Sequence, residues 1–105
     1  MRWYKNLYIS KEAQPERKNI IKNIKRNKSV LFAYLIIIEN NDSNKNKGIL
    51  TIVHSIFFLR NYTKKDNVII IGIACGRMDA FRLAGSIIYE VYNKTGGFDI
   101  KKYIV

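Results

Sequence analysis

Residues 68–74 read VIIIGIA, and the chain continues through Gly76 into a long amphipathic segment. Because the run is apolar at almost every position, an extended segment here needs cover on both faces, which is typical of a central β-strand. Apolar residues then recur at helical spacing until Gly96–Gly97, where glycine readily adopts the left-handed conformation that ends helices. The sequence therefore predicts a central strand followed by a long helix, capped by Gly76 or Asp79. The helix residues expected to be buried against the sheet are Phe81, Leu83 or Ala84, Ile87, Ile88 and Val91.

Upstream of this unit lies a second apolar run, VLFAYLIII at residues 30–38. It is too short and too rich in β-branched side chains for a free-standing helix, so it is predicted to be a strand. Residues 49–53 are expected to return as an antiparallel strand after the very polar loop 40–48. Residues 55–62 (SIFFLRNY) are too apolar for a loop and are predicted to form a short helix before the polar break at 63–67.

The N-terminal part predicts one strand and one helix. Residues 2–9 (RWYKNLYI) alternate in the manner of a strand, and the lysine is typical of a sheet edge. Pro15 is suited to a first helical turn, because that turn needs no N–H from it. Residues 15–28 then form a surface helix. Its narrow apolar stripe consists of Ile20, Ile21 and Ile24.

This order of elements predicts a single α/β domain spanning residues 1–105, with α+β as the open alternative. We expect a mixed sheet of three to five strands, two main helices and one short helix. Residues 49–74 are long enough for a small βαβ unit. The tail, 98–105 (FDIKKYIV), is compatible with a further strand or with an ordered arm.

The composition is strongly basic, with 19 Lys and Arg against 8 Asp and Glu and a formal charge of +11. Such a charge indicates an anionic partner. However, 18 isoleucines, 13 lysines and 11 asparagines are also what an AT-rich genome encodes, so part of the charge is expected to be ordinary solvated surface.

The helix predicted at 15–28 is the best candidate for an anion-binding surface. Lys18, Lys22 and Lys25 follow i, i+4, i+7 spacing, so they share one helix face that can track a phosphate backbone. The alternative, a merely solvated lysine face, stays open. The candidate polyanion-binding residues are Arg17, Lys18, Lys22, Lys25, Arg26 and Lys28. The nearby aromatic residues Trp3, Tyr4 and Tyr8 can either stack on bases or pack in the sheet, and packing is the favoured interpretation.

Several kinds of chemistry are poorly supported. One cysteine and one histidine cannot supply the ligands of a structural zinc site, and no metal or other cofactor is expected. A lone cysteine also excludes a disulfide framework and favours a reducing cytoplasm. The longest apolar runs are too short to span a membrane, and residues 1–10 contain no signal-peptide core, so no membrane role is expected.

The segment from Gly72 to Gly76 lies where α/β folds often bind ligands, but it matches no phosphate-binding motif, and a tight strand-to-helix turn is favoured. Cys75 lies in this turn, and a thiolate dyad with His54, oriented by Asp79, is conceivable. A phosphatase loop is excluded, because Arg82 comes one position too late. Cys75 is therefore expected to be a structural, buried thiol, and no catalytic residue is predicted.

Two segments, RWYKNLYIS at 2–10 and VIIIGIACGRMDAFRLAGSIIYEVYNKTGGFDIKKYI at 68–104, carry a family resemblance. Their aromatic first strand, G-I-A strand, and long helix ending in E-V-Y-x-x-T-G resemble an uncharacterised family of small basic α/β proteins of low-GC gut anaerobes. Genes of this family often lie near integrative and conjugative elements. The resemblance implies an α/β fold and a mobile-element accessory role, such as DNA transfer, regulation or interference with host defence.

Two functional hypotheses follow. The first is a small binding module for nucleic acid or another polyanion. The second is a protein-interaction or inhibitor protein, for example an anti-defence protein, that acts on an acidic partner through a sheet edge or through a homodimer interface.

Overall fold

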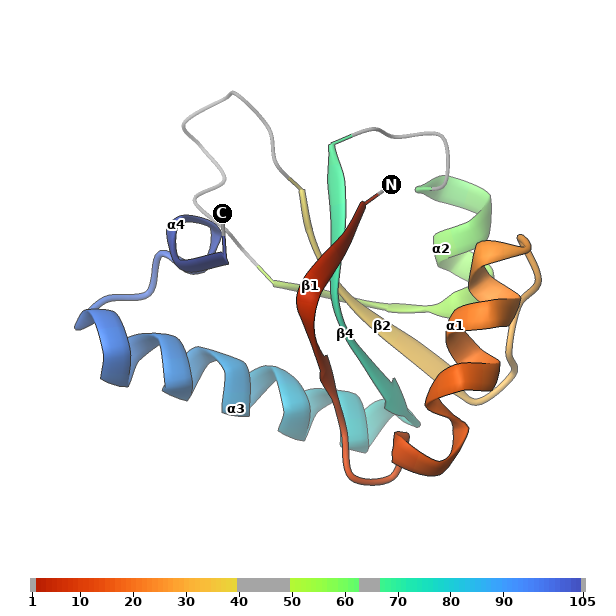
Figure 1. The fold of residues 1–105 in the computed structure, drawn as a ribbon, viewed down its shortest axis with the longest axis horizontal. Coiled ribbons are helices and arrows are strands. Elements are labelled where there is room, and N and C mark those ends of the chain that lie inside the picture. Colours follow the sequence, from red (N-terminus) through yellow and green to blue (C-terminus); the bar gives the residue numbers. More distant parts are fainter. Residues whose placement is uncertain (1, 40–49, 63–66, 105) are drawn as a thin grey trace.

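The computed structural model describes residues 2–39, 50–62 and 67–104, and these form a mixed α/β fold, as predicted (Figure 1). The strands are β1 (Arg2–Ile9), β2 (Ala33–Glu39), β3 (Thr51–His54) and β4 (Val68–Cys75). The helices are the short 3-10 helix η1 (Gln14–Glu16), α1 (Arg17–Lys25), α2 (Ser55–Asn61), α3 (Arg77–Thr95) and α4 (Ile100–Ile104). The polar loop predicted at 40–48 and most of the break at 63–67 lie outside the described residues.

The four strands form one sheet in the order β1-β4-β2-β3. β4 is parallel to β1, whereas β2 is antiparallel to both of its neighbours, β4 and β3. The predicted central position of β4, the edge position of β1 and the antiparallel β2–β3 pair are therefore confirmed. Residues 49–74 do not form a simple βαβ unit, because β2 lies between β3 and β4.

Helices cover both faces of the sheet, with α1 and α2 on one side and α3 and α4 on the other (Figure 1). We call the core between the sheet and α1 and α2 the first core, and the core between the sheet and α3 and α4 the second core. Successive residues of β2 and β4 point to opposite faces, so Ile37 and Ile70 enter the first core while Ile36 and Ile71 enter the second. This arrangement explains why both strands are apolar at almost every position. Each fully buried isoleucine contributes roughly 1.5–3 kcal/mol of hydrophobic stabilisation.

The N-terminal helix and β2 are both shorter than expected. Pro15 lies in η1, and the α-helix itself begins at Arg17 and ends at Lys25, so the basic segment continues beyond the helix. β2 begins at Ala33 rather than at Val30. The backbone of Val30 is instead bound by the Ser55 side chain, whose Oγ accepts from its N–H at 3.1 Å and donates to its carbonyl at 2.6 Å.

The predicted register of α3 is partly wrong. Ile87 and Val91 are fully buried as expected, but Phe81 is 51% exposed and Ile88 is 36% exposed. The apolar positions of this helix span a wider arc than the sheet can cover. The helix packs through its small residues Ala80 and Ala84.

Both ends of α3 follow the prediction. Gly76 is the N-cap residue, and Gly96 ends the helix in the left-handed conformation with a φ of 74°. The tail forms α4 rather than an additional strand. Ile100 of α4 is buried in the second core, so the tail is an ordered arm.

Candidate functional site

The cationic side chains are distributed unevenly between the two helical layers. Residues 17–28 contain six cations and no acidic residue, whereas residues 77–95, which form α3, contain three cations and two carboxylates. All six cations of the 17–28 segment are exposed. The segment that contains α1 is therefore more basic than α3.

Burial of two isoleucines fixes the orientation of α1. Ile20 and Ile24 are almost completely buried in the first core, which turns Lys18, Lys22 and Lys25 toward solvent. A shallow open hollow of about 420 Å³ lies on this surface. The hollow is lined by Ile21 and by four cations. We call these four cations the basic face: Lys18, Lys22, Lys25 and Arg26.

The other two predicted residues do not line this hollow. The guanidinium of Arg17 turns back along the chain and donates to the carbonyl of Gln14 at 2.9 Å. Lys28 lies beyond the end of α1, where its backbone N–H donates to the carbonyl of Asn23 at 2.8 Å. The structure therefore brings together four of the six predicted cations.

A cation–π contact connects the basic face to the edge of the sheet. The ammonium of Lys25 lies 5.6 Å from the centre of the Trp3 ring, and Trp3 in turn packs against the first core. Arg2 and Lys5, on either side of Trp3 in β1, are exposed. These two cations were not among the predicted residues, because only the fold places the end of α1 beside β1.

The aromatic side chains of β1 make packing contacts within the protein. Trp3 lies under Lys25, and the rings of Tyr4 and Tyr8 stack on each other at 6.0 Å and pack against the second core. The Tyr8 hydroxyl donates to Glu90, and burial together with this carboxylate raises the pKa of Tyr8. The packing interpretation of these aromatics is therefore confirmed.

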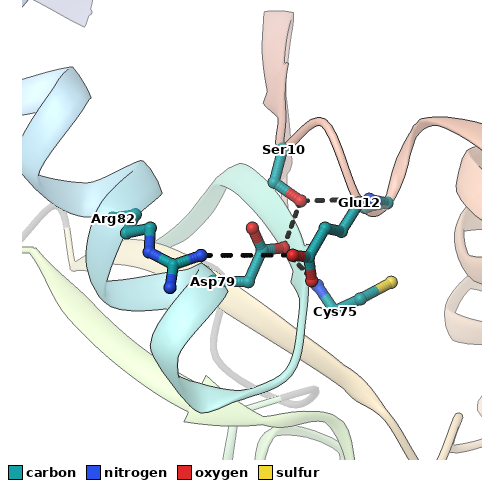
Figure 2. Close-up of polar contacts among 6 residues, drawn as sticks. Ser10, Glu12, Cys75, Asp79 and Arg82 are labelled. Atoms are coloured by element: carbon teal, nitrogen blue, oxygen red, sulfur yellow. Dashed lines mark hydrogen bonds and ion pairs between the residues drawn. The ribbon is translucent and has the colours of Figure 1, made fainter.

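The polar groups of the turn between β4 and α3 are bound within the protein, chiefly by Asp79 together with Ser10 at the end of β1 (Figure 2). The buried carboxylate of Asp79 accepts from the Ser10 hydroxyl and, at 2.8 Å, from the N–H of Cys75. The N–H of Gly76 donates to the carbonyl of Phe32 at 2.9 Å. Because a carboxylate already lies at the start of α3, this turn is poorly suited to binding a phosphate.

Cys75 and His54 do not form a dyad. The Nδ1 atom of His54 accepts from the N–H of Ile56 at 3.1 Å, and its Nε2 atom lies 2.6 Å from the carbonyl of Leu31, so the proton is on Nε2. His54 also lies on β3, which β2 separates from β4.

The thiol of Cys75 is not activated either. Its partial burial, followed by the negative charge of Asp79, raises the pKa of Cys75, which favours the protonated thiol at neutral pH. Cys75 packs against the first core but is only partly buried, so the full burial predicted from the sequence is wrong.

Metal-binding clusters and membrane-spanning helices are both absent from the described part of the chain. Among residues 2–39, 50–62 and 67–104, no group of three or more His, Cys, Asp or Glu side chains is placed to hold a metal ion. Within the same ranges, none of the helices combines the length and the apolar character needed to cross a bilayer.

Comparison with protein-family models, curated proteins and solved structures found no match.

Proposed function

We propose that this protein binds nucleic acid or another polyanion through the basic face of α1. The observation that carries the proposal is the convergence of Lys18, Lys22, Lys25 and Arg26 around one open hollow. No acidic residue lies between positions 17 and 28, although Glu16 directly precedes the segment, so the positive field of these four cations is little compensated along the chain. Such a surface attracts phosphates or sulfates and releases their counterions on binding.

The chemistry of the face favours backbone contacts over base recognition. Three of its four cations are lysines, which act as mobile point charges, whereas arginine forms bidentate pairs with phosphate or guanine. The rings of Trp3, Tyr4 and Tyr8 are engaged in packing, so they offer little stacking surface for single-stranded bases. We therefore expect binding that depends on charge density and little on sequence.

The biological setting of this proposal is a mobile-element accessory protein of the cytoplasm. The family resemblance supports such a role, and the single unpaired cysteine is compatible with a reducing compartment. Of the roles that the resemblance implies, DNA transfer and regulation involve contact with nucleic acid, whereas interference with host defence also fits the alternative of an inhibitor protein.

The test measures fluorescence anisotropy with single- and double-stranded DNA and RNA of equal length at low salt. Reversing Lys18, Lys22 and Lys25 to Glu is expected to abolish binding without unfolding the protein, since all three side chains are exposed. The matched control reverses Arg77, Lys94 and Lys102, which are also exposed and lie on the opposite layer. It changes the net charge equally and is expected to retain most of the affinity.

The control distinguishes a localised site from overall charge. Equal loss of affinity in both variants would mean that net charge, not the basic face, drives binding. If the wild type binds none of the four nucleic acids or heparin at low salt, the alternative function takes over. In that case the protein acts as an interaction or inhibitor protein on an acidic protein partner.

A further inference from the structure

The outer surface of α3 carries large apolar side chains that the fold does not bury. Met78 is 64% exposed and Tyr89 is 68% exposed, in addition to Phe81, which is half exposed, and Ile88, which is about one third exposed. Isolated exposed apolar residues are common, but several on one helix mark an interaction surface. We call the following set the apolar stripe: Met78, Phe81, Ile88, Tyr89 and Tyr92.

The spacing of this stripe is that of a helix that pairs with another helix. Four of its members, together with Gly85, follow one another at intervals of three, four, three and four residues: Met78, Phe81, Gly85, Ile88 and Tyr92. This is the a/d pattern of a coiled-coil seam. Within the protomer the sheet packs against the other side of α3, and two rings of the stripe have local partners: Phe81 lies under Arg77, and Tyr92 stacks on Phe98.

Gly85 lies at the middle of this pattern and is exposed. A Cβ atom added there would meet nothing within 4 Å, so the protomer itself does not require glycine. Glycine is nonetheless the least favourable residue in a helix interior apart from proline. A glycine at this position would allow the backbone of a second helix to approach closely, which explains the choice of this residue.

We infer that the apolar stripe is the interface of a homodimer whose two-fold axis passes near Gly85. Four of its five members are symmetric about this residue: Met78 and Tyr92 are each seven positions away from it, and Phe81 and Tyr89 are each four, whereas the position symmetric with Ile88 is Arg82. A two-fold axis therefore places Met78 of one copy opposite Tyr92 of the other, and Phe81 opposite Tyr89. These are sulfur–aromatic and aromatic–aromatic pairs, which associate well.

The available area reaches that of a small dimer interface. Side chains of about 200 Å² each, between a third and two thirds exposed, offer roughly 500–700 Å² per copy when Phe98, which stacks on Tyr92, is included. If all six side chains are covered, two copies together bury about 1,000–1,400 Å², which is at the low end of the range for biological interfaces. The basic faces lie on the opposite layer of each copy, so the dimer leaves both free.

Sedimentation velocity over about 1–100 µM protein tests this inference. The wild type is expected to form a dimer whose dissociation constant increases at least about 30-fold in the Phe81→Ser/Ile88→Ser variant, as for the loss of interface hot spots. The control variant Leu31→Ser/Phe57→Ser removes two apolar side chains elsewhere, 81% and 53% exposed, and is expected to leave the dimer unchanged. A wild type that stays monomeric, or a dimer that only the control weakens, overturns the inference.

Salt separates this interface from the proposed polyanion site. Because each copy carries a formal charge of +11, the copies repel each other and added salt is expected to tighten the dimer. Polyanion binding changes in the opposite direction. A dimer that dissociates as salt increases would contradict an apolar interface, without bearing on the basic face.

A cross-link provides a readout that does not depend on the folding of the serine variant. In a Cys75→Ser background, Gly85→Cys is expected to form a disulfide-linked dimer under mild oxidation, because residues near a two-fold axis come within disulfide distance. Ser86→Cys, one position further along the helix and off the stripe, is the control. Equal cross-linking of the two variants would show that Gly85 does not lie near the two-fold axis and would overturn the inference.

Discussion

At the scale of single residues, Asp79 is the side chain that organises the junction between β1, β4 and α3. The sequence suggested it as a helix cap, but spacing alone offered no reason to connect it with Ser10, 69 positions away. The parallel pairing of β1 with β4 brings the ends of these two strands together. The partner of Asp79 is therefore set by sheet topology, which residue spacing does not predict.

Replacing Asp79 by Ala is expected to lower the free energy of unfolding by about 2–3 kcal/mol. The change leaves the Ser10 hydroxyl and the Cys75 N–H without their acceptor in a buried place. Glu12→Ala, which removes an exposed carboxylate 4.0 Å from Arg82, is the control and is expected to cost less than about 1 kcal/mol. Urea denaturation measures both values, and similar costs would show that Asp79 is not a stabilising centre.

Cys75 provides a second test at this scale. Because burial and Asp79 raise its pKa, the thiol is expected to react slowly with an alkylating reagent at neutral pH and rapidly in denaturant. The folded state disfavours the thiolate, so stability present below the ordinary thiol pKa is lost as the pH rises through the raised value. Cys75→Ser is expected to reduce this alkaline loss and leave polyanion binding intact. Fast native labelling that His54→Ala slows would instead establish an active thiolate.

At the scale of elements, the apolar runs made most of the fold predictable. The strands β2 and β4 and the helices α2 and α3 were all identified, because continuous apolar runs indicate buried strands and periodic ones indicate helices. The register of α3 was harder, since spacing shows which residues share a helix face but not how much of that face the sheet covers. Phe81 and Ile88 were therefore predicted to be buried and are exposed.

The corrected register of α3 predicts different effects on stability for substitutions of two adjacent isoleucines. Ile87→Asp is expected to unfold the protein, because an unpaired charge in a fully buried position costs several kcal/mol against a total stability of roughly 5–15 kcal/mol. Ile88→Asp changes a side chain that is 36% exposed and is expected to leave a folded protomer. Circular dichroism during thermal unfolding measures the difference. Two equally unstable variants would show that both isoleucines are needed in the core.

At the scale of the whole molecule, the two helical layers have different surface chemistry. The α1 layer presents the basic face, and the α3 layer presents the apolar stripe. The i, i+4, i+7 spacing of the lysines was visible in the sequence, as was the total charge. The contact of Lys25 with Trp3, and the turning of Arg17 away from the face, depend on neighbouring elements and could not be predicted from spacing.

The salt dependence of nucleic-acid binding tests the central claim most directly. For double-stranded DNA, the slope of log K against log salt is about −0.9 for each phosphate neutralised, so four cations predict a wild-type slope of roughly −3 to −4. The Lys18, Lys22 and Lys25 reversal is expected to bring this slope close to zero, while the reversal of Arg77, Lys94 and Lys102 retains most of it. A wild-type slope close to zero, or a slope that the α1 reversal leaves unchanged, would contradict binding of polyanions by the basic face.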